Sequence, residues 1–416
     1  MKSRIAFLAD AESKNAILKK KIIRLCIKGG KYSIADFSRE INASVPTVTK
    51  LIGELIDDGF ILDLGKQGTA GGRRPSIFGL NPGAGYFIGV DIGRQHLHMG
   101  IADFSGKLIN YVQDVDFVLE ATTMSFRSLC AKIKDTVSNT GIAWHEVLAV
   151  GVSLSGRVNP EKGYSLTYSV SEDLPLKSFF EQELGVNVSI ENDSRAMTYG
   201  EYISNPSKAN PNTLFINVSW GLGMGLILGG ELYYGVSGFS GEIGHFPLLH
   251  NNRICRCGKI GCLETEASGS ALHANLIEQI QAGRTSSLSE IYKEKGDVSL
   301  DEILKAVEDE DVLAIEGIEQ IGHTLGRSIA GLINIFNPGM VIIGGRLMVG
   351  KDYLMLPIRS AINKHSLSRV SSDTVIRFSE LGRRAAPFGL RQRLGHRELR
   401  VPRRVCGEVG LRGLRG

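Results

Sequence analysis

The stretch YFIGVDIGRQHLHMGIADFSGKLINYVQDVDF, residues 86–117, predicts three successive β-strands joined by short turns. Apolar and polar residues alternate along it with the period of two that strands require. A helix is expected over residues 122–139, followed by the buried strand VLAVGVSLSG over residues 147–156. Strands and helices in this β-β-β-α-β order indicate an α/β fold.

A similar order recurs more loosely later in the chain. The segments TLFINVSW (213–220) and LGMGLILGGELYYG (222–235) alternate as strands. A long helix is predicted over residues 311–336, and it leads to the buried strand MVIIGG at 340–345. We therefore predict a body over residues 83–380, built from two similar halves with a cleft where they meet.

Length and composition limit the class of protein. With 416 residues the chain is too long for one ordinary core. A hydrophobic share of 43% with 22% charged residues is typical of a globular protein in water. No apolar run approaches the roughly 18–20 residues that span a bilayer, and the N-terminus lacks the pattern of a secretory signal. We therefore expect a cytoplasmic protein without a membrane partner.

Charge is distributed unevenly along the chain. Residues 1–80 hold 14 Lys and Arg against 8 Asp and Glu, a net charge of +6. The counts for residues 81–380 are 24 and 34, a net charge of −10. A basic segment before an acidic body is typical of a nucleic-acid-binding module joined to another domain, although a solvated surface can have the same charge.

The head, residues 1–82, contains three predicted amphipathic helices. The first covers residues 19–28, the second follows Ser33 as N-cap, and the third follows Ser44 with Pro46 in its first turn. Only the short Asn42-Ala43 turn separates the second helix from the third. This tight connection predicts a helix-turn-helix.

The segment that follows, residues 60–82, predicts a strand, a glycine-rich turn and a second strand, which is the pattern of a wing. Exposed guanidinium groups at the wing tip suit phosphate or minor-groove contacts. A three-helix packing module without a DNA partner is the alternative. The candidate DNA contacts are Ser44, Thr47, Thr49 and Lys50 on the third helix and Arg73 and Arg74 at the wing tip.

Three cysteines lie within eight residues in CRCGKIGC, residues 255–262. Cys255, Cys257 and Cys262 offer three thiolates, and His245, ten residues earlier, can complete a tetrahedron. Four protein ligands leave no open position, so we predict a structural metal site with zinc as the ion. No helix with a closely spaced pair of histidines follows, which argues against a DNA-binding finger.

Three segments of the body resemble a known family. ENDSRAMTYGE (191–201), SGEIGH (240–245) and CRCGKIGCLE (255–264) are similar to signature segments of the ROK family of repressors, open reading frames and kinases. The resemblance implies an actin-like (ribonuclease H-like) duplicated sugar-kinase-type α/β domain, here preceded by a winged helix-turn-helix. With its head, the chain resembles the regulators of the NagC, Mlc and XylR type, and the family's zinc ligands match the four residues above.

Candidate sugar ligands are carboxylates and amides, because a sugar hydroxyl both donates and accepts hydrogen bonds. The resemblance implies that the sugar-contacting positions are Gly156, Asn192, Asp193, Glu242, His245 and Glu264. It also implies that Asp193 is the base of the family's kinases. The simpler alternative is that Asn192 and Asp193 only cap a helix and that Glu242 only bonds the backbone.

Two loops depart from the phosphate-binding loops of the ROK kinases. Where those kinases have Asp-x-Gly-Gly-Thr, residues 91–95 read DIGRQ; where they have Gly-Thr-Gly-x-Gly, residues 219–223 read SWGLG. Trp220 replaces a hydroxyl donor by a bulky indole. Phosphoryl transfer needs a phosphate cradle, so we predict that the chain is not an enzyme, with a sugar kinase as the alternative.

The tail, residues 381–416, carries ten arginines and no lysine. A basic tail can bind nucleic acid, but we favour a shifted reading frame or another sequence discontinuity, and we expect no small-residue helix after residue 380.

Taken together, the sequence predicts a sugar-responsive transcriptional regulator, most simply a repressor of carbohydrate-use genes. Its expected partners are operator DNA, a sugar or sugar-phosphate effector, and further copies of itself in a homodimer or homotetramer. A DNA-binding scaffold with an empty cleft is a further alternative.

Overall fold

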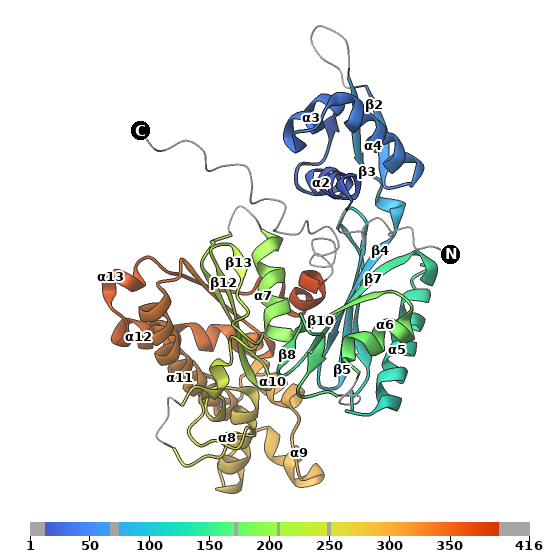
Figure 1. The fold of residues 1–416 in the computed structure, drawn as a ribbon. Helices are drawn as coiled ribbons and strands as arrows, with labels where there is room; N and C mark the ends of the chain where they lie inside the picture. The colour runs from blue at the N-terminus through green and yellow to red at the C-terminus, as the bar shows by residue number, and fades with distance from the viewer. Residues whose placement is uncertain (1–12, 67–74, 170–173, 206–208, 248–250, 391–416) are drawn as a thin grey trace. The chain divides into compact units, whose positions relative to one another are not determined.

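A computed structural model describes residues 13–66, 75–169, 174–205, 209–247 and 251–390 (Figure 1). The chain divides into two compact units. Unit 1 comprises Met1–Val152, Tyr168–Ser189 and Leu390–Gly416, and unit 2 comprises Ser153–Thr167 and Ile190–Gly389. Among the residues that the structure describes, no helix is both long enough and apolar enough to cross a bilayer.

The head has the three predicted helices and the two predicted wing strands, with one further short strand between the first two helices. Its helices are α2 (Lys14–Gly29), α3 (Ile34–Ile41) and α4 (Val45–Asp57), and its strands are β1 (Tyr32–Ser33), β2 (Ile61–Lys66) and β3 (Ser76–Leu80). These strands form a sheet in the order β1-β3-β2. The first helix begins five residues before the predicted residue 19, because the Ser13 hydroxyl caps it by accepting from the Ala16 N–H at 3.1 Å.

Local signals fix the helix-turn-helix. Ser33 and Asp36 form a reciprocal capping box at the start of α3. Asn42, with φ of 53°, takes the left-handed conformation that ends α3, and Ser44 caps α4 two residues later. The predicted turn of two residues is therefore confirmed.

Within unit 1 the head shares a hydrophobic cluster with the first half of the body. The ring of Phe60, directly before β2, lies 5.2 Å from the ring of Phe104, and Phe104 lies 6.0 Å from Phe87. Leu148 belongs to the same cluster. The hydrophobic cluster thus includes residues from both sides of residue 82. The domain boundary at residue 82 remains a prediction.

The first half of the body follows the predicted order. One sheet has the strand order β10-β7-β4-β5-β6. Its members are β4 (Tyr86–Ile92), β5 (His96–Asp103), β6 (Leu108–Asp116), β7 (Val147–Leu154) and β10 (Asn187–Asn192), and the accompanying helices are α5 (Thr123–Ser138) and α6 (Leu176–Leu184). The strand β10 ends in unit 2, where it leads directly into helix α7 (Asp193–Ser204).

Unit 2 is built on a second sheet, in the order β13-β12-β11-β14-β15. Its strands are β11 (Thr213–Val218), β12 (Leu222–Leu228), β13 (Glu231–Leu232), β14 (Met340–Gly344) and β15 (Val375–Phe378). The remaining elements are the hairpin β8 (Val158–Asn159) and β9 (Tyr164–Ser165) and the helices α8 (Gly269–Gln281), α9 (Leu288–Lys295), α10 (Leu300–Glu308), α11 (Val312–Phe336), α12 (Lys351–His365) and α13 (Ser368–Ser371).

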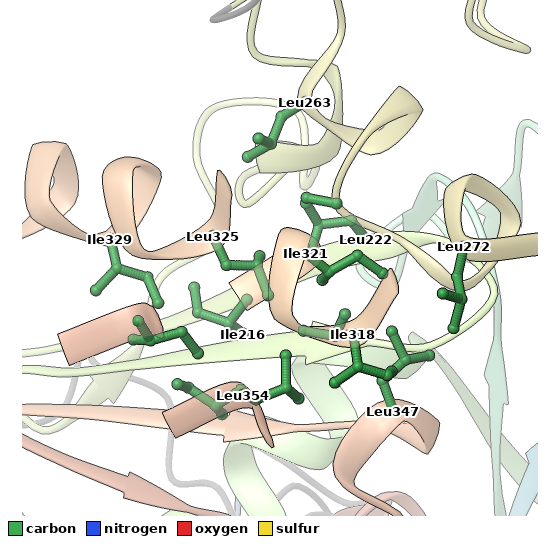
Figure 2. Close-up of a cluster of buried hydrophobic side chains, with 14 of the residues drawn as sticks. Ile216, Leu222, Leu263, Leu272, Ile318, Ile321, Leu325, Ile329, Leu347 and Leu354 are labelled. Atoms are coloured by element: carbon green, nitrogen blue, oxygen red, sulfur yellow. The ribbon is translucent and has the colours of Figure 1, made fainter. Parts of the chain in front are cut away.

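The two faces of this sheet differ in what covers them. On one face, the long helix α11 and its neighbour α12 bury an aliphatic cluster that includes Ile216 and Leu222 of the sheet (Figure 2). On the other face lies α7, which packs on β11 and β12. Because side chains alternate along a strand, Asn217 points away from the aliphatic cluster, and its amide reaches Ser194 of α7.

The expectation that no small-residue helix follows residue 380 is wrong for the part of the tail that the structure describes. Residues 385–390 are helical and pack on α7 so closely that the backbones nearly touch. The carboxylate of Glu201 on α7 holds this segment by accepting from Ser379 Oγ at 2.5 Å and from the Leu381 N–H at 2.8 Å. Its short Ala-Ala-Pro-Phe-Gly sequence was obscured by the surrounding arginines. Residues 391–416 lie outside the described residues.

Gly200 provides a test of this contact. A Cβ atom at Gly200 would lie 2.0 Å from the carbonyl oxygen of Ala385, which is backbone and cannot turn aside. We expect Gly200→Ala to lower the free energy of unfolding by about 2 kcal/mol, measured by urea denaturation. The matched control is Gly331→Ala on α11, where the added Cβ meets open space. That change should be neutral or stabilising by up to about 1 kcal/mol. Equal effects of the two variants would contradict the packing.

Candidate functional site

Asn192 and Asp193 lie where β10 ends and α7 begins. The Asn192 Oδ1 caps the helix by accepting from the Arg195 N–H at 3.1 Å, so the capping alternative is correct as far as it goes. The amide has a second use, because Nδ2 donates to the Gly156 carbonyl at 3.0 Å and to Asp193 Oδ1 at 2.9 Å. This arrangement brings three of the predicted sugar-contacting positions together.

Gly156 needs to be glycine in this arrangement. Its φ of +84° lies in the left-handed region, and a Cβ atom would meet the Thr167 hydroxyl at 2.1 Å. The loop can therefore turn its Gly156 carbonyl toward Asn192 only without a side chain.

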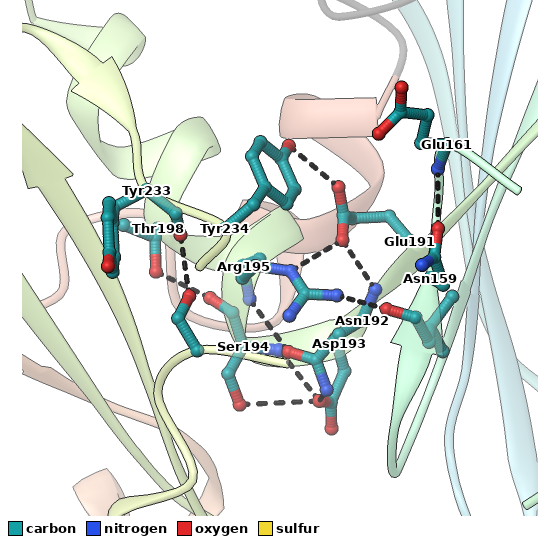
Figure 3. A network of polar contacts seen from close by, with 12 residues as sticks. Asn159, Glu161, Glu191, Asn192, Asp193, Ser194, Arg195, Thr198, Tyr233 and Tyr234 are labelled. Carbon is teal, nitrogen blue, oxygen red and sulfur yellow. Dashed lines mark hydrogen bonds and ion pairs between the residues drawn. The ribbon is translucent and has the colours of Figure 1, made fainter. Parts of the chain in front are cut away.

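Beneath these residues lies a buried ion pair that the sequence did not reveal. Arg195 Nε donates to Glu191 Oε1 at 2.7 Å, and both side chains are almost fully buried, at 2% and 1% exposed. The Tyr234 hydroxyl donates to the other Glu191 oxygen at 3.0 Å, and Arg195 Nη2 donates to the Val158 carbonyl at 2.7 Å (Figure 3). Asn159 continues the network by donating from Nδ2 to the Ser237 carbonyl at 2.8 Å. The network joins three separate segments around Asn192 and Asp193.

Glu242 and His245 lie on the short loop before the cysteine segment. His245 Nε2 is 3.8 Å from Glu242 Oε2, while Nδ1 is 3.6 Å from Cys255 Sγ. One ring nitrogen therefore lies beside the Cys255 thiol and the other lies beside the carboxylate. Within the described residues no backbone N–H donates to the Glu242 carboxylate. This side chain is 37% exposed, so the carboxylate is open to a ligand.

The four predicted metal ligands converge. One ligand atom from each of His245, Cys255, Cys257 and Cys262 lies within 4.8 Å of the others. Cys257 Sγ is 3.6 Å from Cys262 Sγ, which is close to the edge, about 3.8 Å, of a tetrahedron with metal–sulfur bonds of about 2.3 Å. The cluster can therefore hold a metal ion with no change in its donor set.

The carboxylate of Glu264 is partly engaged by the protein backbone, unlike a side chain that is fully free to bind a sugar. Its Oε2 accepts from the Leu222 N–H at 2.9 Å, next to Gly221 and Gly244, which leave room for it. The carboxylate is close enough to Glu242 for their like charges to interact. One oxygen of Glu264 is thus used to hold the 219–222 loop.

Burial and charge act together on the acidic residues. Removal from water raises the pKa of the Asp193 carboxyl, the N–H and hydroxyl of Ser194 oppose this rise, and the charge of Glu242 adds to it. Burial also raises the pKa of Glu242, with His245 opposing. The site therefore brings together carboxylates that repel one another electrostatically. Because carboxylates accept hydrogen bonds, such a site favours ligands that donate from hydroxyl groups.

The loop at residues 219–223 corresponds to the second phosphate loop of the kinases, and several of its backbone groups are hydrogen-bonded within the protein. The Leu222 N–H is bonded to Glu264, and the Ser219 N–H donates to the Gly221 carbonyl at 3.0 Å. The carbonyls of Ser219 and Trp220 accept from the first N–H groups of α8, at 2.8 and 2.9 Å. The Trp220 ring lies 5.6 Å from the ring of His273. Two N–H groups and three carbonyls of this loop are therefore bonded within the protein.

The predicted DNA contacts lie on one helix as expected where the structure describes them. Ser44, Thr49 and Lys50 are exposed on α4, and Thr47 is half-buried, bonded through its hydroxyl to Ser44 Oγ at 2.8 Å. The Thr49 hydroxyl donates to the Val45 carbonyl. Arg73 and Arg74 lie outside the described residues.

Comparison with known proteins assigns the chain to a family. The family model described as "ROK family" matches residues 87–391, and the chain belongs to this family. The xylose repressor of Bacillus spizizenii is 27% identical over 386 residues, covering 92% of this chain and 96% of that protein. The DNA-binding transcriptional dual regulator NagC of Escherichia coli is 28% identical over 368 residues, covering 88% and 89%.

A solved structure agrees along nearly the whole length. The crystal structure of a ROK family transcriptional regulator, a homologue of the E. coli MLC protein, matches with a TM-score of 0.75 and 27% identity. The match covers 92% of this chain and 97% of that one. The resemblance inferred from the three signature segments is therefore confirmed.

Proposed function

We propose that the chain is a sugar-responsive transcriptional repressor. The observation that carries the proposal is the pairing, in one chain, of a helix-turn-helix head with a ROK body that matches named repressors along most of their length. A sugar kinase with an attached DNA module is not favoured, because Trp220 stands where the phosphate loop of the kinases has a threonine, and the N–H groups of Ser219 and Leu222 are bonded within the protein.

The proposed DNA-binding face is the exposed polar side of α4. Ser44, Thr49 and Lys50 project from a helix whose opposite side is buried in the head. Hydroxyl and ammonium groups at the start of such a helix suit base edges and phosphates in a major groove. Thr47 belongs to the same face, and Arg73 and Arg74 at the wing tip complete the proposed contacts.

The proposed effector is a sugar or sugar phosphate bound by Gly156, Asn192, Asp193, Glu242, His245 and Glu264. Zinc is the proposed ion of the His245 and cysteine cluster, since three thiolates and one imidazole in a closed tetrahedron suit it best. Its role is structural: it fixes the ring of His245, which in turn faces Glu242 at 3.8 Å.

The proposed working form is a cytoplasmic homodimer or homotetramer that binds paired operator half-sites. An effector changes operator affinity only if it binds one arrangement of the protein more tightly than another. A coupling free energy of about 1.4 kcal/mol changes operator affinity tenfold.

The test is a mobility-shift titration of operator DNA, selected from genomic fragments, with D-xylose, N-acetyl-D-glucosamine and their phosphates. We expect at least one of these to change operator affinity tenfold or more. Lys50→Ala should weaken DNA binding while the sugar still raises the melting temperature, and Asp193→Asn should do the reverse. If no sugar affects either measurement, the scaffold alternative replaces this proposal. ATP-dependent sugar phosphorylation that Asp193→Asn abolishes would favour the kinase.

A further inference from the structure

A chain of hydrogen bonds crosses unit 2 from the end of β14 to Asp193. The Arg346 N–H donates to Ser219 Oγ at 3.2 Å, and Ser219 Oγ donates to Asn217 Oδ1 at 2.8 Å. Asn217 Nδ2 then donates to Ser194 Oγ at 3.1 Å, and Ser194 Oγ reaches Asp193 Oδ1 at 3.3 Å. The chain has one direction, because it starts at an N–H group that only donates and ends at a carboxylate that only accepts.

Asn217 is the residue on which this direction depends. Its side chain accepts from Ser219 and donates to Ser194, and a carboxylate of the same shape would accept from both. Only 4% of Asn217 is exposed, so water cannot take over either role.

The surroundings leave the chain little freedom. A Cβ atom at Gly223 would lie 2.3 Å from Ser194 Oγ, and one at Gly345 would lie 2.7 Å from Asn217 Oδ1. Both glycines belong to segments that flank β11, so backbone holds the hydroxyl of Ser194 and the amide of Asn217 in place from two sides.

At Asp193 the bonds divide the two carboxylate oxygens. Oδ1 accepts from Asn192 Nδ2 at 2.9 Å, from the Ser194 N–H at 2.7 Å and from Ser194 Oγ. For Oδ2 the described residues offer no hydrogen-bond partner, so it is the oxygen left to accept from a ligand hydroxyl. Whatever fixes Oδ1 therefore fixes the direction in which Oδ2 points.

We propose that Asn217 is a positioning residue for the Asp193 carboxylate, acting through Ser194, so that strand β11 sets the geometry of a ligand-accepting oxygen on α7. The inference rests on the proposed function, since the ligand of Oδ2 is taken to be a sugar. It adds a residue inside an apolar strand to a site otherwise built from loops and one helix end.

The primary test compares Asn217→Asp and Asn217→Ala with the unchanged full-length protein. In Asn217→Asp, the new carboxylate accepts from Ser194, the hydroxyl turns away from Asp193, and a like charge is added nearby. We expect the pKa of Asp193 to rise by about one unit or more, followed by carboxyl ¹³C NMR of aspartate-labelled protein with Asp193→Asn as the assignment standard. The affinity for D-xylose or N-acetyl-D-glucosamine, whichever the unchanged protein binds, should fall about tenfold.

A double-mutant cycle separates positioning from general stability. Ser194→Ala should weaken sugar binding about threefold, and adding Asn217→Ala to it should cause no further loss, because the two residues act in series. The matched control is Thr198→Val on the same helix. Thr198 is 1% exposed and donates to the Ser194 carbonyl, not to Asp193. Its replacement should lower the melting temperature and leave both the pKa of Asp193 and sugar affinity unchanged.

An unchanged pKa of Asp193 in both Asn217 variants, or equal effects of Asn217→Ala with and without Ser194, would overturn the proposal. Should Asn217→Asp fail to fold, the pair Ser194→Ala and Asn217→Ala decides the same question without a buried charge. If the unchanged protein binds none of the sugars and sugar phosphates of the operator titration, the proposed function fails on its own, while the pKa of Asp193 still decides the role of Asn217.

Discussion

Replacement of Arg195 by Met should lower the free energy of unfolding by about 3–5 kcal/mol, because it leaves the carboxylate of Glu191 buried without its charge partner. Glu191 is 1% exposed, so water cannot solvate the abandoned charge. The loss also frees the Val158 carbonyl, which accepts from Arg195 at 2.7 Å. Urea denaturation, followed by far-ultraviolet circular dichroism, measures the change.

The double variant Arg195→Met with Glu191→Gln is the matched control. It removes both charges, and a neutral amide at residue 191 can still accept from the Tyr234 hydroxyl. We expect it to recover at least half of the stability lost in the single variant, since the uncompensated charge is the main cost. A single variant within about 1 kcal/mol of the unchanged protein would show that the pair does not stabilise unit 2.

Cys257→Ser should abolish stoichiometric zinc binding and the stabilisation that comes with it. For free zinc at a thousand times its dissociation constant, binding contributes about 4 kcal/mol, so the melting temperature should fall by roughly 10 °C. A chelator should produce a similar fall in the unchanged protein and none in the variant. Calorimetry with and without chelator, alongside metal analysis, gives both quantities.

Cys130→Ala is the control for loss of a thiol. Cys130 is buried on α5 and belongs to unit 1, whereas the four ligands belong to unit 2. Its replacement should leave zinc content and sensitivity to the chelator unchanged. The sugar response should be weaker in Cys257→Ser, because His245 faces Glu242 as well as the thiols. Retention of one zinc per chain by Cys257→Ser would contradict the proposed ligand set.

The strands, helices and metal ligands could be predicted because each depends on local pattern. Alternation of apolar residues predicted β4, β5 and β6, and caps such as Ser33 and Ser44 predicted where α3 and α4 begin. Three thiolates and an imidazole within eighteen residues predicted the metal cluster without knowledge of the fold.

The interior polar contacts could not be predicted, because they depend on which strand faces which helix. Arg195 sits in a helix segment where an arginine ordinarily points to water, and nothing local indicates that Glu191 is buried beside it. Asn217 likewise interrupts an apolar strand without a sign of its partners. The available signal was the presence of a polar residue, Asn217, in a strand that is largely apolar. Such a residue indicates a buried polar partner without identifying it.

The packed aromatic contact in unit 1 also limits how the head can be used. Phe60, Phe104 and Phe87 place residues from both sides of position 82 in one hydrophobic cluster. A head of this kind is not an interchangeable cassette: transplanted onto another ROK body, it would expose Phe60 unless that body supplied matching rings. Recombination between regulators should therefore succeed more often when the crossover falls after Ala149, the last member of this cluster, than when it falls in the connection near residue 82.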